Sequence, residues 1–188
     1  HDALPIYLSG DGMPDILAAR SGDSTVGVLV NRGDGTFGEA TLQGEPGDPS
    51  AMAVGDFNRD QVPDVALAFP LDDTVRVLLN RGGGIFAVGT RLATGDGTQF
   101  LAVGDVDGDD NPDLAVTGAA NSTVDVMLGS ENGTFVIGAT YPLSQYPTSL
   151  VFADLNADGA PDIAATEHPA ATFSVLMNDG AAAFGGAL

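Results

Sequence analysis

The sequence contains no cysteine and no lysine, and its only Lys/Arg cations are six Arg. Without cysteine there can be no disulfide, no thiolate metal site and no cysteine nucleophile. Against the six Arg stand 22 Asp and four Glu, which gives a formal net charge of −20. This excess of acid argues against a surface that binds nucleic acid and against a basic face that docks on membranes. No apolar run approaches the roughly 18 residues of a membrane helix, so we expect no membrane insertion.

Hydrophobic residues nevertheless make up 44% of the 188 residues. That share is far above what a charge-driven disordered segment carries, so the chain is expected to fold. The 26 Gly and 11 Pro suggest short strands separated by many turns. The length fits one domain or one compact array of repeats.

A repeat with a period of 49 residues runs through the chain. Six columns are identical in all four copies, with no insertion between them. Three of these columns are the prolines Pro14, Pro63, Pro112 and Pro161, the aspartates Asp15, Asp64, Asp113 and Asp162, and the phenylalanines Phe37, Phe86, Phe135 and Phe184. The repeat units are 1–49, 50–98, 99–147 and 148–188.

Each unit is predicted to form four short strands. In the second unit these cover 51–56, 64–69 and 74–80, with a fourth that starts at Phe86. The third strand carries a position that we expect to be exposed, occupied in turn by Gly27, Arg76, Asp125 and Ser174. Four-stranded antiparallel units of this length, stacked around an axis, predict an all-β fold, a β-propeller with four blades in this chain. A linear β-solenoid is the lesser alternative, since its coils are usually shorter.

The loop after the first strand is rich in aspartate in three units. It reads Asp-x-Asx-x-Asp-x-x-x-Asp, a spacing that points alternate oxygen ligands toward one centre. The seventh position of the loop would add a backbone carbonyl. The candidate metal ligands are therefore Asp56, Asn58, Asp60, Val62 and Asp64; Asp105, Asp107, Asp109, Asn111 and Asp113; and Asp154, Asn156, Asp158, Ala160 and Asp162.

Hard oxygen ligands without His or Cys favour Ca²⁺ over Zn²⁺, and a flexible cage with many protein ligands favours it over Mg²⁺. An EF-hand is rejected, because its twelfth position needs Glu and this chain has Leu67, Val116 and Ala165 there. Aspartate also caps turns, but three loops in register make a shared metal function the better interpretation. Three structural Ca²⁺ ions would change the formal charge from −20 to −14.

The sixth loop position usually needs glycine for a left-handed turn. It is Gln61, Asp110 and Gly159 here, so the second loop is predicted to be slightly strained. The first unit departs further, because Tyr7 and Ser9 occupy two ligand positions. Only Asp11 and Asp15 remain as carboxylates, so we predict that this unit binds metal weakly or not at all.

These loops, followed by segments such as Val77-Leu78-Leu79-Asn80 and a Gly-rich turn before the repeated Phe, resemble the FG-GAP/VCBS repeat family. That family includes the integrin α-subunit propeller and many secreted bacterial proteins. The resemblance implies a β-propeller with structural Ca²⁺ in the loops that join the first two strands of each blade. It implies the same ligand positions as the spacing does, and leaves the first unit in doubt.

Propellers of this family usually have more blades than the four found here. The chain would close as a rare four-bladed ring, belong to something longer, or form a homo-oligomer in which two chains complete a larger propeller. Loops of moderate affinity fill where calcium is millimolar, so an extracellular or cell-surface location is expected.

The favoured function is a calcium-stabilised, lectin-like scaffold that binds a glycan or a protein. The alternative is the propeller domain of a polysaccharide lyase or hydrolase. Its only candidate pair is Glu167 and His168, which we expect to lie in a solvated loop because Pro169 follows. With no convincing catalytic group, the sequence argues against an enzyme.

Overall fold

The computed structural model describes residues 6–20, 22, 24–44, 47–169 and 171–185, and within these ranges it contains strands and no helix. The strands in chain order are β1 (Ile16–Arg20), β2 (Thr25–Leu29), β3 (Thr41–Gly44), β4 (Ala51–Gly55), β5 (Asp64–Phe69), β6 (Thr74–Asn80), β7 (Phe86–Ala93), β8 (Thr98–Gly104), β9 (Asp113–Gly118), β10 (Thr123–Gly129), β11 (Phe135–Pro142), β12 (Tyr146–Ala153), β13 (Asp162–His168) and β14 (Thr172–Leu176).

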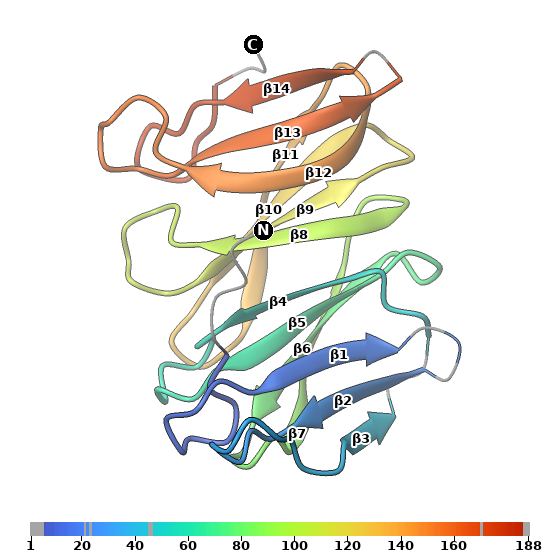
Figure 1. Ribbon diagram of the computed structural model, residues 1–188. Helices are drawn as coiled ribbons and strands as arrows, with labels where there is room; N and C mark the ends of the chain where they lie inside the picture. Colours follow the sequence, from blue (N-terminus) through green and yellow to red (C-terminus); the bar gives the residue numbers. More distant parts are fainter. Residues whose placement is uncertain (1–5, 21, 23, 45–46, 170, 186–188) are drawn as a thin grey trace.

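The strands form four antiparallel sheets in sequence order, β1–β3, β4–β7, β8–β11 and β12–β14 (Figure 1). The two middle sheets have four strands, as the repeat predicts, and the two terminal sheets have three. In the first sheet a single bridge between Ile6 and Asp15 stands where a first strand was expected. In the last sheet a bridge between Asn178 and Phe184 stands in place of the fourth. The all-β prediction is therefore confirmed.

The second strand of each middle sheet is buried along its whole length. All six residues of β5 and all six of β9 are buried. Apolar side chains point to both faces of these strands, as in Val65-Ala66-Leu67, because a neighbouring sheet covers each face. Register is therefore strongly fixed, with Ala66 opposite Val77 and Val65 opposite Leu78.

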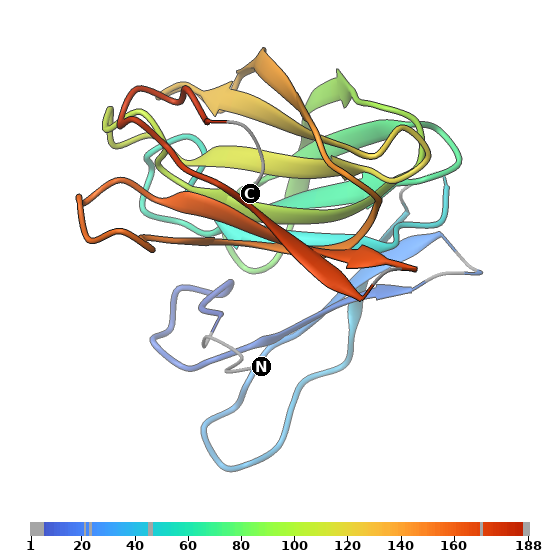
Figure 2. The same cartoon turned by 90° about the horizontal axis from the view of Figure 1, so that it is seen from above.

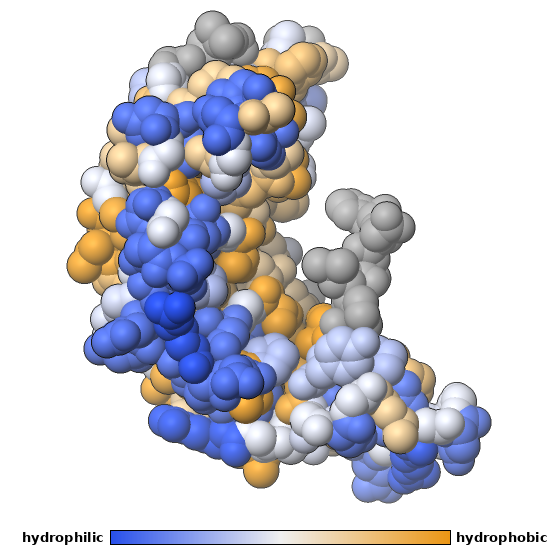
Figure 3. Space-filling view, turned by 90° about the vertical axis from the view of Figure 1, so that its left-hand side faces the viewer, coloured by the Kyte–Doolittle hydropathy of each residue, from blue (hydrophilic) through white to orange (hydrophobic). Residues whose placement is uncertain are grey.

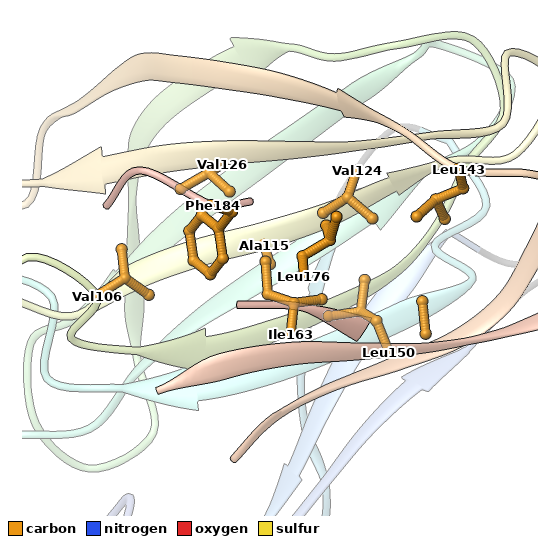
Figure 4. Close-up of a cluster of buried hydrophobic side chains, with 10 residues drawn as sticks. Val106, Ala115, Val124, Val126, Leu143, Leu150, Ile163, Leu176 and Phe184 are labelled. Atoms are coloured by element: carbon orange, nitrogen blue, oxygen red, sulfur yellow. The ribbon is translucent and has the colours of Figure 1, made fainter. Parts of the chain in front are cut away.

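A separate hydrophobic cluster fills each space between consecutive sheets. Figure 4 shows the cluster between the third and fourth sheets, where Val124 and Val126 of β10 meet Ile163 and Leu176 of the last sheet. Between the second and third sheets, Phe57 packs edge-on against Phe135 with ring centroids 5.6 Å apart. The core of the molecule is thus a series of similar junctions rather than one centre.

The expectation that the repeated polar position of the third strand is exposed was wrong. Gly27, Arg76, Asp125 and Ser174 are all buried. Buried polar groups need partners, and the side chains of Arg76, Asp125 and Ser174 each have one. Arg76 pairs with Asp72 and lies over the ring of Phe69, and Asp125 accepts hydrogen bonds from the Gly95 N–H and the Thr140 hydroxyl.

The sheets follow one another along an arc, with β1–β3 at one end and β12–β14 at the other (Figure 1). In the space-filling view the molecule has a C-shaped outline (Figure 3). The loops that join the first two strands of each repeat project from one side, at the left in both Figure 1 and Figure 2. The described part of the chain has no helix that is long and apolar enough to span a membrane.

Candidate metal centre

The three aspartate-rich loops lie together on the side of the molecule that faces the viewer in Figure 3, where hydrophilic residues gather along the arc. Each loop begins where the first strand of a sheet ends, so β4, β8 and β12 position them. The sheets repeat the same register, and the loops therefore emerge at equivalent places. The repeat itself brings the candidate ligands to one side.

The loop between β8 and β9 gathers three carboxylates. Oxygen atoms of Asp105, Asp107 and Asp109 lie within 4.8 Å of one another. The loop backbone wraps around them, since Asp105 accepts hydrogen bonds from the Gly108 N–H at 2.8 Å and the Asp110 N–H at 2.9 Å. Three converging hard oxygen donors without nitrogen or sulfur fit Ca²⁺.

Left-handed backbone makes this wrapping possible. The sixth loop position has a positive φ in all three loops, 67° at Gln61, 65° at Asp110 and 93° at Gly159. The left-handed turn expected at this position is thereby confirmed, although a non-glycine residue adopts it twice. The fourth position is left-handed as well, and it is a non-glycine residue at Arg59 and Ala157. Such residues cost more than glycine in this conformation, so the second loop carries two unfavourable positions.

In the aspartate-rich loops of the second and fourth repeat units, an amide replaces one carboxylate. Asn58 donates its Nδ2–H to Asp60 at 2.9 Å, and Asn156 donates likewise to Asp158 at 2.7 Å. The amide oxygen of each Asn accepts the N–H of the same aspartate, at 3.0 and 2.9 Å. These loops hold fewer converging carboxylates than the third, so the strongest charge for a cation lies at Asp105, Asp107 and Asp109.

The last aspartate of each loop stands apart from this group. Asp64 is fully buried and accepts the N–H groups of Phe57 at 3.0 Å and Asn80 at 2.8 Å. Asp113 accepts those of Val106 and Gly129, both at 2.7 Å. Asp162 is bonded in the same way, to Leu155 and Asn178. Each of these aspartates begins the second strand of its sheet, and its hydrogen bonds tie that strand to the loop and to the end of the third strand. Their role as metal ligands stays a prediction.

The first unit shows that this tie does not depend on metal ligands. Asp15 accepts the N–H groups of Ser9 at 2.8 Å and Asn31 at 2.9 Å, although Tyr7 and Ser9 replace the other ligands. Within the described part of the chain, the Asp11 carboxylate accepts only the nearby N–H of Met13, at 2.8 Å. The spacing predicts calcium ligands at Asp64, Asp113 and Asp162, and a weak or absent site at Asp15, in the same repeat column. The first unit keeps this aspartate although it lacks the other metal ligands. That is the signal in the sequence that indicates a structural role for the column.

Burial controls the electrostatics of the tied aspartates. It raises the pKa of Asp64 to about 6 and that of Asp113 to about 6, even though backbone N–H groups stabilise both anions. Repulsion from neighbouring loop carboxylates contributes to both raised pKa values. Burial and the charge of Asp109 also raise the pKa of Asp107 above its ordinary value. The loops therefore hold negative charge that favours either protons or a cation.

Lowering the pH should stabilise the calcium-free protein. Between about pH 4 and 6 the folded state binds protons at Asp64 and Asp113 that the unfolded chain does not bind. Thermal melts in EDTA should therefore give a melting temperature several degrees higher at pH 5 than at pH 7. In excess calcium the rise should disappear, because protons and Ca²⁺ compete for the same carboxylates. A calcium-free melting temperature that falls steadily from pH 7 to pH 5 would contradict this assignment.

The candidate catalytic pair is not assembled. The expectation of a solvated loop was wrong for Glu167, which lies buried in β13 and accepts hydrogen bonds from the Ser144 and Ser174 hydroxyls. Burial alone would raise its pKa, but these hydroxyl donors outweigh it and lower the pKa of Glu167. His168 is exposed at the end of the same strand. Adjacent strand residues point to opposite faces, so the two side chains do not converge.

Comparison with known proteins gives a family and a set of similar folds. The sequence profile of the FG-GAP-like repeat matches residues 8–67 and 105–165. None of the curated protein sequences matches this chain. Solved structures resemble it at low sequence identity, and likeness at this level shows the fold alone.

An Agrocybe aegerita lectin, solved with regard to its specific recognition of non-reducing terminal N-acetylglucosamine, matches 98% of the chain at 24% identity and a TM-score of 0.64. BBS1N in complex with ARL6DN matches 97% at 12% identity and a TM-score of 0.66. The Photorhabdus luminescens Tc holotoxin pore matches 87% at 18% identity and a TM-score of 0.52. The chain spans 50% and 51% of the lengths of the first two, and only 8% of the third. The sheets of these structural neighbours are arranged as in a β-propeller.

Proposed function

This chain belongs to the FG-GAP-like repeat family, and from that premise we propose that it is a calcium-stabilised β-propeller binding module that recognises a glycan or a protein outside the cell. The family resemblance expected from the loops is thereby confirmed. The observation that carries the proposal is the convergence of Asp105, Asp107 and Asp109 in one loop. Loops of the same pattern occur in three repeat units, on the same side of the molecule (Figure 1).

Calcium has a structural role in this proposal. Each loop would supply side-chain oxygens from its first, third and fifth positions and a backbone carbonyl from its seventh, at Val62, Asn111 and Ala160. The tied aspartates Asp64, Asp113 and Asp162 would complete the ligand sets with lone pairs not used by the backbone N–H groups. A bound cation removes the repulsion among the loop carboxylates and fixes the loop against its sheet.

The proposed location follows from the metal. Loops that are open to solvent and contain amide ligands bind calcium with moderate affinity. Such sites fill where free calcium is millimolar, as it is outside cells, and stay largely empty in cytosol. The module is therefore placed in an extracellular or cell-surface setting.

An open cavity offers a place for a small polar ligand. Its volume is about 360 Å³, and it lies where the end of β7 meets β10 and β11. The lining combines polar side chains with an aliphatic one and consists of Ala93, Thr94, Gly95, Asn121, Thr123, Asp125, Ile137 and Thr140. Both oxygens of Asp125 are engaged, at 2.7 Å each, by Gly95 and Thr140, so this carboxylate fixes the shape of the cavity. A few placed polar groups on an apolar wall suit a sugar ring.

Glycan binding tests the recognition half of the proposal. Calcium-loaded protein should bind at least one class of an immobilised glycan panel that includes chains ending in non-reducing N-acetylglucosamine. Asn121 is exposed at the cavity, so Asn121→Ala should weaken this binding about tenfold or more, by the loss of one or two hydrogen bonds.

The exposed Gln145 lies outside this cavity and provides the matched control, Gln145→Ala. This control should bind as the parent protein does. Glycan binding that Asn121→Ala leaves unchanged would exclude the cavity as the site. A panel without any bound glycan would exclude the glycan and leave a protein ligand as the object of recognition.

A further inference from the structure

Every junction between consecutive sheets is built from the same repeat positions. We call the face of a sheet that meets the next sheet along the chain its forward face, and the opposite one its rear face. On forward faces, Leu8, Phe57 and Val106 occupy one column. They share clusters with Phe86, Phe135 and Phe184, respectively, which belong to the sheet that follows.

A second pair of columns repeats this arrangement. The forward faces carry Val26, Val75 and Val124, which share the three clusters with Val65, Leu114 and Ile163 of the following sheets. All twelve of these side chains are at most 8% exposed. Burial at these positions is therefore the signature of a completed junction.

The two ends of the arc break the pattern in complementary ways. On the forward face of the last sheet, the same columns hold Leu155 and Phe173, which are 50% and 68% exposed. On the rear face of the first sheet they hold Phe37 and Ile16, which are 36% and 43% exposed. A shallow apolar cavity of about 260 Å³ lies beside Phe173, lined in part by Val151 and Ala164. Exposed apolar surface gathered in this way marks an interaction site.

A polar contact of the junction is also left incomplete. Asn80 donates its Nδ2–H to the Leu8 carbonyl of the preceding sheet at 3.0 Å, and Asn178 donates to that of Val106 at 2.8 Å. Each also bonds a proline carbonyl of its own sheet. Asn31 occupies the same column, and among the described residues its Nδ2–H bonds only within its own sheet, to the Pro14 carbonyl at 2.9 Å. The carbonyl that the repeat assigns to Asn31 is that of Leu155.

We propose that the forward face of β12–β14 docks on the rear face of β1–β3 in a second copy of this chain, forming a fourth junction of the same kind. Leu155 would pack against Phe37 as Phe57 packs against Phe135, and Asn31 would bond the Leu155 carbonyl. The two faces are complementary rather than self-complementary, so the contact is head-to-tail and closes a ring when it forms twice.

A second copy suits this role better than the chain's own other end. The two faces lie at opposite ends of the arc (Figures 1 and 3). The chain also spans only 50% and 51% of two single chains that match nearly all of it, so two copies have about the length of one such chain. Two copies with four sheets each would place eight sheets in the ring, which is within the range of about four to eight blades known for propellers.

Solution mass tests the proposal on the 188-residue protein in calcium. Sedimentation equilibrium should give twice the mass of the 18.9 kDa chain. Phe173→Asp places a charge in both junctions of the ring and should raise the dissociation constant of the dimer at least about tenfold. Leu71→Asp, at a leucine that is 85% exposed between β5 and β6, is the matched control and should remain dimeric. A parent protein that is monomeric at all concentrations, or a dimer indifferent to Phe173→Asp, would overturn the proposal.

Cross-linking tests the pairing, because these 188 residues contain no cysteine. Leu155→Cys and Phe37→Cys are made as separate proteins, mixed, and treated with a short bismaleimide. The mixture should give a covalent dimer, and neither protein alone should. A covalent dimer from Leu155→Cys alone would show a symmetric contact instead. A linked monomer from the double variant would show closure within one chain, and either result would overturn the proposal.

Discussion

Removing calcium is expected to lower the melting temperature of this protein by about 15 °C or more. A ligand that binds only the folded state adds about 2.7 kcal/mol per site at one hundred times its dissociation constant. Three such sites add about 8 kcal/mol. For a chain of this size each kcal/mol shifts the melting temperature by roughly 2–4 °C.

The source of this effect is the repulsion that the ions relieve. The three loops contain eleven Asp, and the whole chain has only six Arg to offset them. A single ion pair joins two of these loops among the described residues, Arg59 to Asp110 at 3.8 Å, and both side chains are too exposed for it to stabilise the fold strongly. Melting curves in excess EDTA and in millimolar calcium provide the measurement. Readdition of calcium after EDTA should restore the higher value, and identical curves in both conditions would contradict the metal assignment.

Replacing Asp113 with Asn is expected to destabilise the calcium-free protein by about 2–4 kcal/mol. Both oxygens of this buried carboxylate accept backbone N–H groups, from Val106 and Gly129. An amide offers one oxygen and turns a second donor toward an N–H, which leaves a buried donor without an acceptor. Urea unfolding at pH 7 in EDTA measures the change in the free energy of unfolding without any contribution from bound metal.

Two further variants distinguish the stability lost with the backbone hydrogen bonds from the stability lost with a metal ligand. Asp15→Asn removes the same tie from the first unit, where the metal ligands are missing, and should cost a similar amount. Asp107→Asn introduces the residue that Asn58 and Asn156 already supply in the other loops, so it should change stability in EDTA by less than about 0.5 kcal/mol. If Asp15→Asn were as mild as Asp107→Asn, the tie would not have the structural importance assigned to it.

The repeat made most of the fold predictable. Its period located the strands of the middle sheets to within a few residues, because β-branched runs and Gly-rich turns recur at fixed offsets. The three-stranded terminal sheets were not anticipated, since the sequence there still follows the repeat while pairing reduces to the single bridges at Ile6 and Phe184.

The errors concern polar residues inside the protein. A polar side chain at the position of Arg76 or Ser174 suggests solvent, yet the partners that satisfy it come from other strands and turns. Ser174 donates to Glu167, and Arg76 contacts Asp72. These pairings do not follow the repeat, because each unit has a different residue at the position. A single unit therefore gives no pattern from which such a partner is predicted.

The candidate metal centre was only partly predictable for a related reason. Spacing alone brought Asp105, Asp107 and Asp109 into one group, as the structure has it. The column of Asp15, Asp64, Asp113 and Asp162 has the same residue type but ties strands together by backbone hydrogen bonds. Residue type and spacing do not distinguish an aspartate that binds metal from one that joins strands through backbone hydrogen bonds, whereas burial does.

Direct titration with calcium tests the central claim that three loops of this chain bind the cation. Isothermal titration calorimetry of metal-free protein at pH 7 should show uptake of about three Ca²⁺ per chain. Asp105→Ala should remove one of them, because it deletes a member of the carboxylate group in the third loop. Magnesium at the same concentration should bind far more weakly. A titration without calcium uptake would contradict the account.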